Sequence, residues 1–328
     1  TVAGRGSSEM VGQLLNAPYF RSVLAYGGAS LVTGIVAKIL ITKLFFDYPI
    51  VILMLQMATL LFTVEVLRVC GVVKLAPYTF DKGRHLFVPS TLMSVSSWLT
   101  ISSYEGIALP LFDPVKRFTP LVIFLISTFI YRKQARLDKK TFVTVLAVCI
   151  TSSFAVNFEL TMGRFSLFYG LMACVLHALA FIQFENLSST FSPLEMIYMH
   201  SFNSLVVFLA ADIVQDEIRD AFMYVMTSSN KSFFFLFLVL MVLGIFLQYT
   251  TFHCIANGGA LTTAVVANGR DAFQAIFSYY TAAYLYYDLY PGWTNWFSFL
   301  ALGAALYSYF RSHDHDAVQK ATPFAVKC

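Results

Sequence analysis

Apolar stretches of about 20 residues recur along the chain, and this repetition limits the possible folds more than any other feature. A helix of that length is long enough to cross the hydrocarbon core of a bilayer. Hydrophobic residues make up 58% of the chain and charged residues 12%, whereas a soluble domain typically has about 25% charged residues. The sequence therefore predicts an all-α membrane protein that crosses the bilayer many times.

The apolar stretches predict ten transmembrane helices separated by polar segments. The expected spans are Arg21–Ile41, Tyr48–Leu67, His85–Tyr104, Pro110–Tyr131, Thr141–Val156, Phe165–Phe184, Pro193–Asp212, Phe233–Ile255, Ala260–Tyr286 and Gly292–Phe310. They form one ten-helix domain over residues 21–310, between polar tails at 1–20 and 311–328. Because the number of spans is even, both tails are expected on the same side of the membrane.

The distribution of Lys and Arg predicts which side that is, because cytoplasmic loops are enriched in these residues. Of the 22 basic residues, 14 lie on the side of the two tails, 4 on the opposite side and 4 inside the spans. An error in the number of spans would have scrambled this bias. The pattern therefore supports ten spans, and it predicts that both termini are cytosolic.

The two halves of the chain, about 21–160 and 161–310, share a pattern that indicates an internal duplication. In the fourth and ninth spans an Ala-Leu pair is followed about two helical turns later by a basic residue, from Leu109 to Arg117 and from Leu261 to Arg270. Halves with five spans each must lie in opposite orientations. We therefore expect two inverted five-helix repeats, a common plan among transporters, with a site between them.

Four cations fall inside the predicted spans: Lys38, Lys116, Arg117 and Arg270. A charge at the centre of the bilayer costs about 2.5–3.5 kcal/mol on insertion scales, so such residues usually face a cavity on a substrate path. Two other interpretations use internal ion pairs. Arg117 has Asp113 one turn before it, and Arg270 is followed directly by an acidic residue, Asp271.

If the halves are inverted, the fourth and ninth spans meet near the midplane and bring Lys116, Arg117 and Arg270 together. Few carboxylates balance these cations, so the site suits a ligand with about two negative charges, such as phosphate or pyrophosphate. The planar guanidinium of arginine binds phosphate oxygens in pairs, while lysine acts as a point charge. Three prolines in the fourth span are expected to kink the helix and open room for the ligand.

Further polar and aromatic residues complete the predicted substrate site. In the ninth span they are Asn268, Asp271 and Gln274, and elsewhere they are Tyr104, His200, Phe202, Asn203 and Tyr249. Their amide, hydroxyl and aromatic groups are suited to a base or sugar, and hydrogen bonding between helices is the alternative role. No catalytic triad, phosphate-binding glycine loop or metal-ligand spacing is present. The sequence predicts no enzyme activity, metal, cofactor or nucleic-acid partner.

Several segments resemble the nucleotide-sugar transporters of the drug/metabolite transporter superfamily, and the resemblance runs from Phe20 to Phe310. The segments are "LPLFDPVKRFTPLVIF", "LTTAVVANGRDAFQAIF" and "WTNWFSFLALGAALYSYF", together with "GIVAKILITK" in the first span and "SFNS" in the seventh. The most similar branch is the one that carries UDP-glucuronic acid and UDP-N-acetylhexosamines. Two positions depart from the family pattern: Ala37 replaces an Asn, and Asp271 stands where an amide is usual.

The resemblance implies antiport by alternating access, in which a cytosolic UDP-sugar is exchanged for a lumenal nucleoside monophosphate. It places Lys116, Arg117 and Arg270 at the nucleotide site and the protein in a Golgi or endoplasmic reticulum membrane. A homodimer is compatible with the sequence. Two alternatives stay open: a transporter of another nucleotide sugar or phosphorylated metabolite, and a non-transporting scaffold of the same fold, which Asp271 favours.

Overall fold

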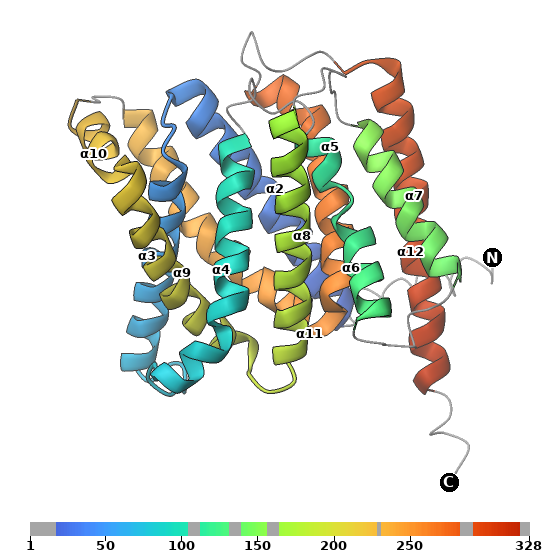
Figure 1. Ribbon diagram of the computed structural model, residues 1–328, viewed down its shortest axis with the longest axis horizontal. Helices are drawn as coiled ribbons and strands as arrows, with labels where there is room; N and C mark the ends of the chain where they lie inside the picture. The colour runs from blue at the N-terminus through green and yellow to red at the C-terminus, as the bar shows by residue number, and fades with distance from the viewer. Residues whose placement is uncertain are drawn as a thin grey trace, which may run out of the picture.

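The computed structural model describes residues 18–103, 112–130, 139–155, 164–227, 231–282 and 291–321, and these residues form helices without any strand (Figure 1). The helices are α2 (Pro18–Leu44), α3 (Pro49–Val69), α4 (Phe80–Ser102), α5 (Phe112–Lys116), α6 (Thr119–Phe129), α7 (Lys139–Ala155), α8 (Arg164–Leu187), α9 (Pro193–Gln215), α10 (Glu217–Thr227), α11 (Lys231–Ala282) and α12 (Trp293–Ala321). The predicted all-α architecture is confirmed for this part of the chain.

Five helices are long and apolar enough to cross a membrane: α2, α3, α8, α9 and α11. Each of the other predicted spans also falls on helix, but α5, α6 and α7 have only 5, 11 and 17 residues. The fourth predicted span is divided between α5 and α6, because the helix is interrupted there. Ten crossings in two inverted halves therefore stay a prediction.

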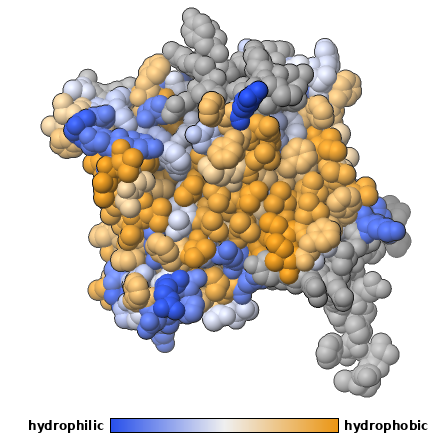
Figure 2. All heavy atoms as spheres, in the orientation of Figure 1, coloured by the Kyte–Doolittle hydropathy of each residue, from blue (hydrophilic) through white to orange (hydrophobic). Residues whose placement is uncertain are grey.

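The surface of the helix bundle has the distribution of polarity that a bilayer requires. Figure 2 shows apolar side chains across the middle of the molecule and hydrophilic residues toward its upper and lower ends. Large apolar side chains are exposed along the helices; Phe62 on α3, for example, is 71% exposed. A soluble protein rarely exposes contiguous apolar patches of such extent. This belt is consistent with a protein that lies in lipid.

α11 consists of two helical halves joined by a kink. The predicted spans Phe233–Ile255 and Ala260–Tyr286 are joined without a loop, because Gly259 alone breaks the helix, with φ 81° and ψ 170°. In Figure 1 the first half of α11 descends from α10 and the second half rises again. The N–H of Ala260, at the start of the second half, donates to the Glu185 carboxylate of α8 at 3.1 Å. Glu185 thus caps a helix that begins inside the bundle.

α2 lies closely along the second half of α11. A Cβ atom added at Gly27 would lie 3.4 Å from Val266, and one added at Gly34 would lie well under 3.0 Å from the Gln274 amide. The contacts advance by seven residues on α2 and by eight on α11, so the two helices run in the same direction. Small residues allow such close approach between transmembrane helices. The packing holds the second half of α11 against a long helix.

We predict that Gly259→Ala destabilises the protein. The φ and ψ of Gly259 lie in a region that is essentially accessible to glycine alone, so a side chain there costs about 1–3 kcal/mol. The measurement is the thermal midpoint of the protein in detergent. Gly303→Ala is the matched control, because a Cβ atom at Gly303 meets nothing within 4 Å. Equal midpoints for the two variants would contradict the prediction.

Candidate functional site

The interruption between α5 and α6 places two basic residues at a break in the helix. α5 ends at Lys116 and α6 begins at Thr119. Pro120 lies in the first turn of α6, where its missing N–H is tolerated, and its ring would clash with the Lys116 carbonyl in a continuous helix. That carbonyl instead accepts a hydrogen bond from the Thr119 hydroxyl at 2.6 Å. Pro120 thus interrupts the helix directly after Lys116 and Arg117.

Neighbouring helices satisfy the other carbonyls that the break leaves free. The Arg117 carbonyl accepts a hydrogen bond from Asn268 Nδ2 of α11 at 2.6 Å. The same amide nitrogen lies 3.3 Å from the Ser152 hydroxyl of α7. The Pro114 carbonyl accepts a hydrogen bond from the Ser153 hydroxyl of α7 at 2.9 Å. Irregular backbone at this depth is therefore buried in protein, as a bilayer requires.

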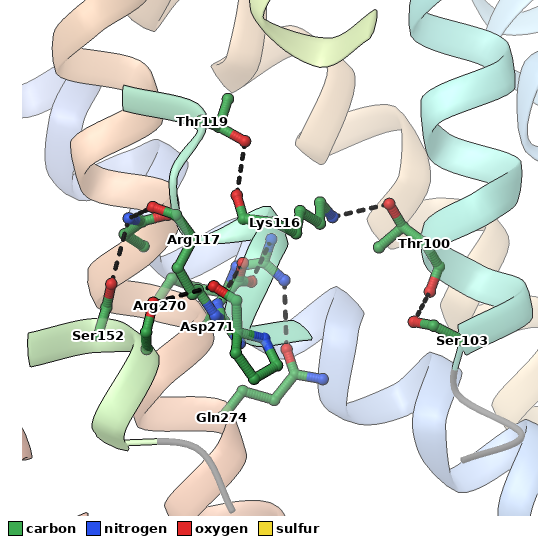
Figure 3. A network of polar contacts seen from close by, with 12 residues as sticks. Thr100, Ser103, Lys116, Arg117, Thr119, Ser152, Arg270, Asp271 and Gln274 are labelled. Atoms are coloured by element: carbon green, nitrogen blue, oxygen red, sulfur yellow. Dashed lines mark hydrogen bonds and ion pairs between the residues drawn. The ribbon is translucent and has the colours of Figure 1, made fainter. Parts of the chain in front are cut away.

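The two arginines share one carboxylate. Arg117 Nη1 lies 2.6 Å from Asp271 Oδ2, and Arg270 Nη2 lies 2.7 Å from Asp271 Oδ1 (Figure 3). Arg117 is 4% exposed, so this contact is shielded from water. Asp113 forms no ion pair with any described residue, and the alternative of an Arg270–Asp271 pair is thus the one realised. Asp271 also extends this pair to Arg117 across the helices.

Lys116 points away from the arginine pair. Its Nζ donates to the Thr100 hydroxyl of α4 at 2.7 Å, and Figure 3 shows its side chain extended toward that helix. The Thr100 hydroxyl donates in turn to the Ser96 carbonyl at 2.7 Å. An ammonium group has three N–H donors, and the described contacts use one of them. Lys116 therefore keeps unused donors at the site.

Gln274 links the arginines to α2. Arg270 Nη1 donates to Gln274 Oε1 at 3.2 Å, and the Gln274 amide lies over Gly34. Arg270 Nε is buried and has no hydrogen-bond partner among the described residues. Lys38 follows Gly34 by one helical turn, so it lies on the same face of α2 and is partly buried there. Lys38 thus lies one turn from the contact of α2 with Gln274.

Two predicted residues lie in a separate polar seam between α4 and α9. His200 Nδ1 is 3.1 Å from the Ser90 hydroxyl. Asn203 accepts a hydrogen bond from the Tyr78 hydroxyl at 3.0 Å and donates to the Gly83 carbonyl at 2.9 Å. Both side chains are buried, and their contacts correspond to the alternative role that the sequence left open, the joining of helices.

The remaining predicted residues are not part of the arginine network. The Phe202 ring lies 4.1 Å from the Tyr78 ring, at the edge of the α4–α9 seam. Tyr249 is 47% exposed on α11, and its ring lies 4.4 Å from that of His253. Tyr104 lies outside the described residues. The structure thus groups Arg117, Asn268, Arg270, Asp271 and Gln274 in one network. Lys116 lies next to Arg117 but extends to Thr100, and the other described candidates lie around or away from the network.

Sequence reasoning missed the hydroxyl partners in this network. Thr100 and Ser152 contact Lys116 and Asn268, but each is a single hydroxyl residue among several in its helix. Nothing in their spacing distinguishes them from residues that bond to their own helix.

Within the described ranges, no three His, Cys, Asp or Glu side chains are grouped as metal ligands. The arrangement is suited to holding an anion, because three cations and one carboxylate carry a net charge of +2.

We predict that Asp271→Asn lowers the stability of the protein strongly. Removing one partner of a buried ion pair leaves an uncompensated charge, at a cost of about 3–5 kcal/mol. Asp220→Asn is the control, because its contact with Arg219, at 3.4 Å, is exposed and such a pair is worth about 0.2–1 kcal/mol. Thermal midpoints in detergent compare the two variants. A midpoint unchanged by Asp271→Asn would show that the arginines are neutralised in another way.

Comparison with known proteins finds transporters. The chain is 26% identical over 257 residues to UDP-galactose/UDP-glucose transporter 7 of Arabidopsis thaliana, covering 75% of this chain and 76% of that protein. It is 25% identical over 251 residues to nucleotide sugar transporter SLC35D2 of Mus musculus, covering 75% of each. One crystal structure shares the fold, with a TM-score of 0.61, 11% identity and coverage of 89% of this chain and 95% of that one. No family profile matches the chain. The chain is thus homologous to nucleotide-sugar transporters, and the relatives do not single out the UDP-glucuronic acid and UDP-N-acetylhexosamine branch.

Proposed function

We propose that the protein is a nucleotide-sugar antiporter that exchanges a cytosolic UDP-sugar for a lumenal nucleoside monophosphate by alternating access. The observation that carries the proposal is the placement of Lys116, Arg117 and Arg270 around a break in a membrane helix, with the Asp271 carboxylate in contact with both arginines. Two relatives named as transporters of UDP-sugars or nucleotide sugars support the class of cargo. Both relatives are named as transporters and not as enzymes.

The arginine pair offers a phosphate the same contacts that it gives Asp271. Each guanidinium group forms an ion pair with one oxygen of a single carboxylate. The diphosphate of a UDP-sugar has two non-bridging oxygens on each phosphorus, and the phosphate of UMP has three oxygens that are not esterified. Either group therefore offers more acceptor oxygens and more negative charge than a carboxylate, and can take both guanidinium contacts and the free donors of Lys116. Asp271 then acts as an internal counter-ion that the phosphate replaces. The interaction fits the α- and β-phosphates of a UDP-sugar and the single phosphate of UMP.

The charge of the site explains why exchange is preferred to one-way transport. A net charge of +2 at membrane depth is costly when the site is empty, because charged groups in the bilayer are poorly solvated. UDP-sugars and nucleoside monophosphates each carry about two negative charges near neutral pH. Either cargo neutralises the site, so the loaded protein changes conformation more easily than the empty one.

The proposal extends to the setting of the protein. The cargo is a UDP-sugar, with UDP-glucuronic acid and UDP-N-acetylhexosamines as first candidates and UDP-galactose and UDP-glucose suggested by one relative. The chain crosses a Golgi or endoplasmic reticulum membrane ten times, as two inverted halves with both termini cytosolic. Association as a homodimer is compatible with this arrangement.

We predict that reconstituted vesicles loaded with UMP take up labelled UDP-sugar much faster than empty vesicles. Arg270→Ala should abolish this uptake, because it removes a charge-assisted contact worth about 1.5–3 kcal/mol and leaves Asp271 to neutralise Arg117. Arg219→Ala is the control, since Arg219 is exposed on α10 and contacts Asp216 and Asp220 only. Equal uptake with and without UMP would rule out obligatory exchange.

One alternative has direct support. Because Asp271 bridges both arginines, the network is also suited to a scaffold that holds its helices together without any cargo. A thermal-shift panel of UDP-, GDP- and CMP-sugars, nucleotides and sugar phosphates distinguishes the antiporter from the scaffold and from a transporter of smaller metabolites. Stabilisation by UDP-sugars supports the antiporter, and stabilisation by sugar phosphates alone supports a transporter of smaller metabolites. No stabilisation by any of them supports the scaffold.

We predict that Gly34→Ala weakens UMP binding about fivefold to tenfold while the protein stays folded, since a hydrogen bond is worth about 0.5–1.5 kcal/mol. A methyl group at Gly34 displaces the Gln274 amide, which is the end of a flexible side chain, and Arg270 loses its hydrogen bond. Gly28→Ala is the matched control on the same helix, because a Cβ atom there meets nothing within 4 Å. The measurement is the dissociation constant of UMP. Equal constants for the two variants would exclude a role of α2 at the site.

A further inference from the structure

One buried side chain near the cations has no role in the site described above. His177 lies on α8, and both of its ring nitrogens are buried without a hydrogen-bond partner among the described residues. Its ring packs edge-on against Phe181, with 4.2 Å between the ring centroids. A buried polar group without a partner costs about 1–3 kcal/mol, so native proteins rarely keep one without a reason.

The neighbours of His177 on α8 show which way this face points. Gly170 lies against α5, because a Cβ atom there would be 3.1 Å from Val115. The Ala173 carbonyl accepts a hydrogen bond from the Ser96 hydroxyl of α4 at 3.3 Å. His177 follows these residues by seven and four positions, so it shares their face of the helix. The face is directed at α4 and α5, the two helices that carry Thr100 and Lys116.

The same face of α8 lies beside the cations of the site. Gly170 of α8 lies against Val115, which directly precedes Lys116 on α5. Burial has the largest influence on the His177 imidazole, and the charges of Lys116 and Arg270 also act on it. α8 thus places His177 beside the part of the bundle to which α5 supplies Lys116 and α11 supplies Arg270. Lys116 and Arg270 can only donate hydrogen bonds, since ammonium and guanidinium groups have no acceptor atom.

We propose that His177 is a cargo-binding residue that hydrogen-bonds a hydroxyl group adjacent to the phosphates. A neutral imidazole offers one donor and one acceptor, which matches a hydroxyl group, whereas the phosphates are served by the cationic donors. In a UDP-sugar the hydroxyl groups next to the diphosphate belong to the ribose and to the sugar. Binding would give the unpartnered nitrogens of His177 their missing hydrogen bond.

This inference rests on the proposed function, and its test separates the two. Dissociation constants of UMP, UDP-glucose and pyrophosphate are measured on the full chain in detergent for wild type, His177→Phe and His177→Gln. Phenylalanine keeps the packing against Phe181 and removes both hydrogen-bonding atoms. We expect His177→Phe to bind UMP or UDP-glucose about tenfold more weakly than wild type, the value of one hydrogen bond.

Two further results are expected if the assignment is correct. His177→Gln, which keeps a donor and an acceptor, should recover part of the affinity, and pyrophosphate, which has no hydroxyl group on carbon, should bind His177→Phe as it binds wild type. His253→Phe is the control, because His253 stacks on Tyr249 away from the network and should leave every constant unchanged.

Three outcomes would overturn the inference. The first is unchanged affinity of His177→Phe for both UMP and UDP-glucose. The second is an equal loss of pyrophosphate binding, which would place His177 on the phosphates or in the fold. The third is failure of wild type to bind any of the three ligands, and this outcome alone also refutes the proposed function.

Discussion

The contact of one carboxylate with two guanidinium groups organises the centre of this protein. Asp271 belongs to α11, Arg270 precedes it on the same helix, and Arg117 stands at the break between α5 and α6. A single arginine at this depth would need water or a ligand, and a single aspartate would be equally costly. Because both arginines contact Asp271, its negative charge offsets part of the cost of burying them. The excess positive charge of the site remains. The helices that carry these residues are held by that contact and by the Asn268 amide on the Arg117 carbonyl.

The interrupted helices of the fold could be predicted only in part. Apolar length places helix at every predicted span, because a segment buried in lipid must be apolar whatever its neighbours are. It does not reveal α10, which lies between two predicted spans and is not continuously apolar. The prolines of the fourth span indicate a kink, and the structure divides the span into α5 and α6 there. The predicted spans leave residues 256–259 as a boundary, but they do not predict a junction at Gly259 without a loop. Its feasibility depends on the Glu185 carboxylate of another helix, and such a partner is not visible in local sequence.

The candidate site, like the fold, could be predicted only in part. Cations inside apolar spans are costly, and therefore Lys116, Arg117 and Arg270 could be selected from sequence alone. Which acid neutralises them could not, since Asp113 on the same helix and Asp271 on another satisfy equally simple patterns. His200 and Asn203 were selected for their polarity, and the structure joins them to α4. His177 was not selected, although its nitrogens have no hydrogen-bond partner within the described part of the chain. In the sequence, a polar residue that bonds to a neighbouring helix cannot be distinguished from one that faces a ligand. The two roles can be told apart only from the contacts in the structure.

The break between α5 and α6 explains why two adjacent cations are retained there. On a helix, neighbouring residues point about 100° apart, so one side chain cannot replace the other. Lys116 extends to Thr100 of α4, and Arg117 extends to Asp271 of α11. α4 packs with α8 and α9, and the second half of α11 packs along α2 and is capped by Glu185 of α8. An anion that engages both cations is therefore held between α4 and α11, and the attraction that binds it also draws these two helices together. In the proposed antiporter, binding of the cargo and movement of the helices would thus depend on the same pair of residues.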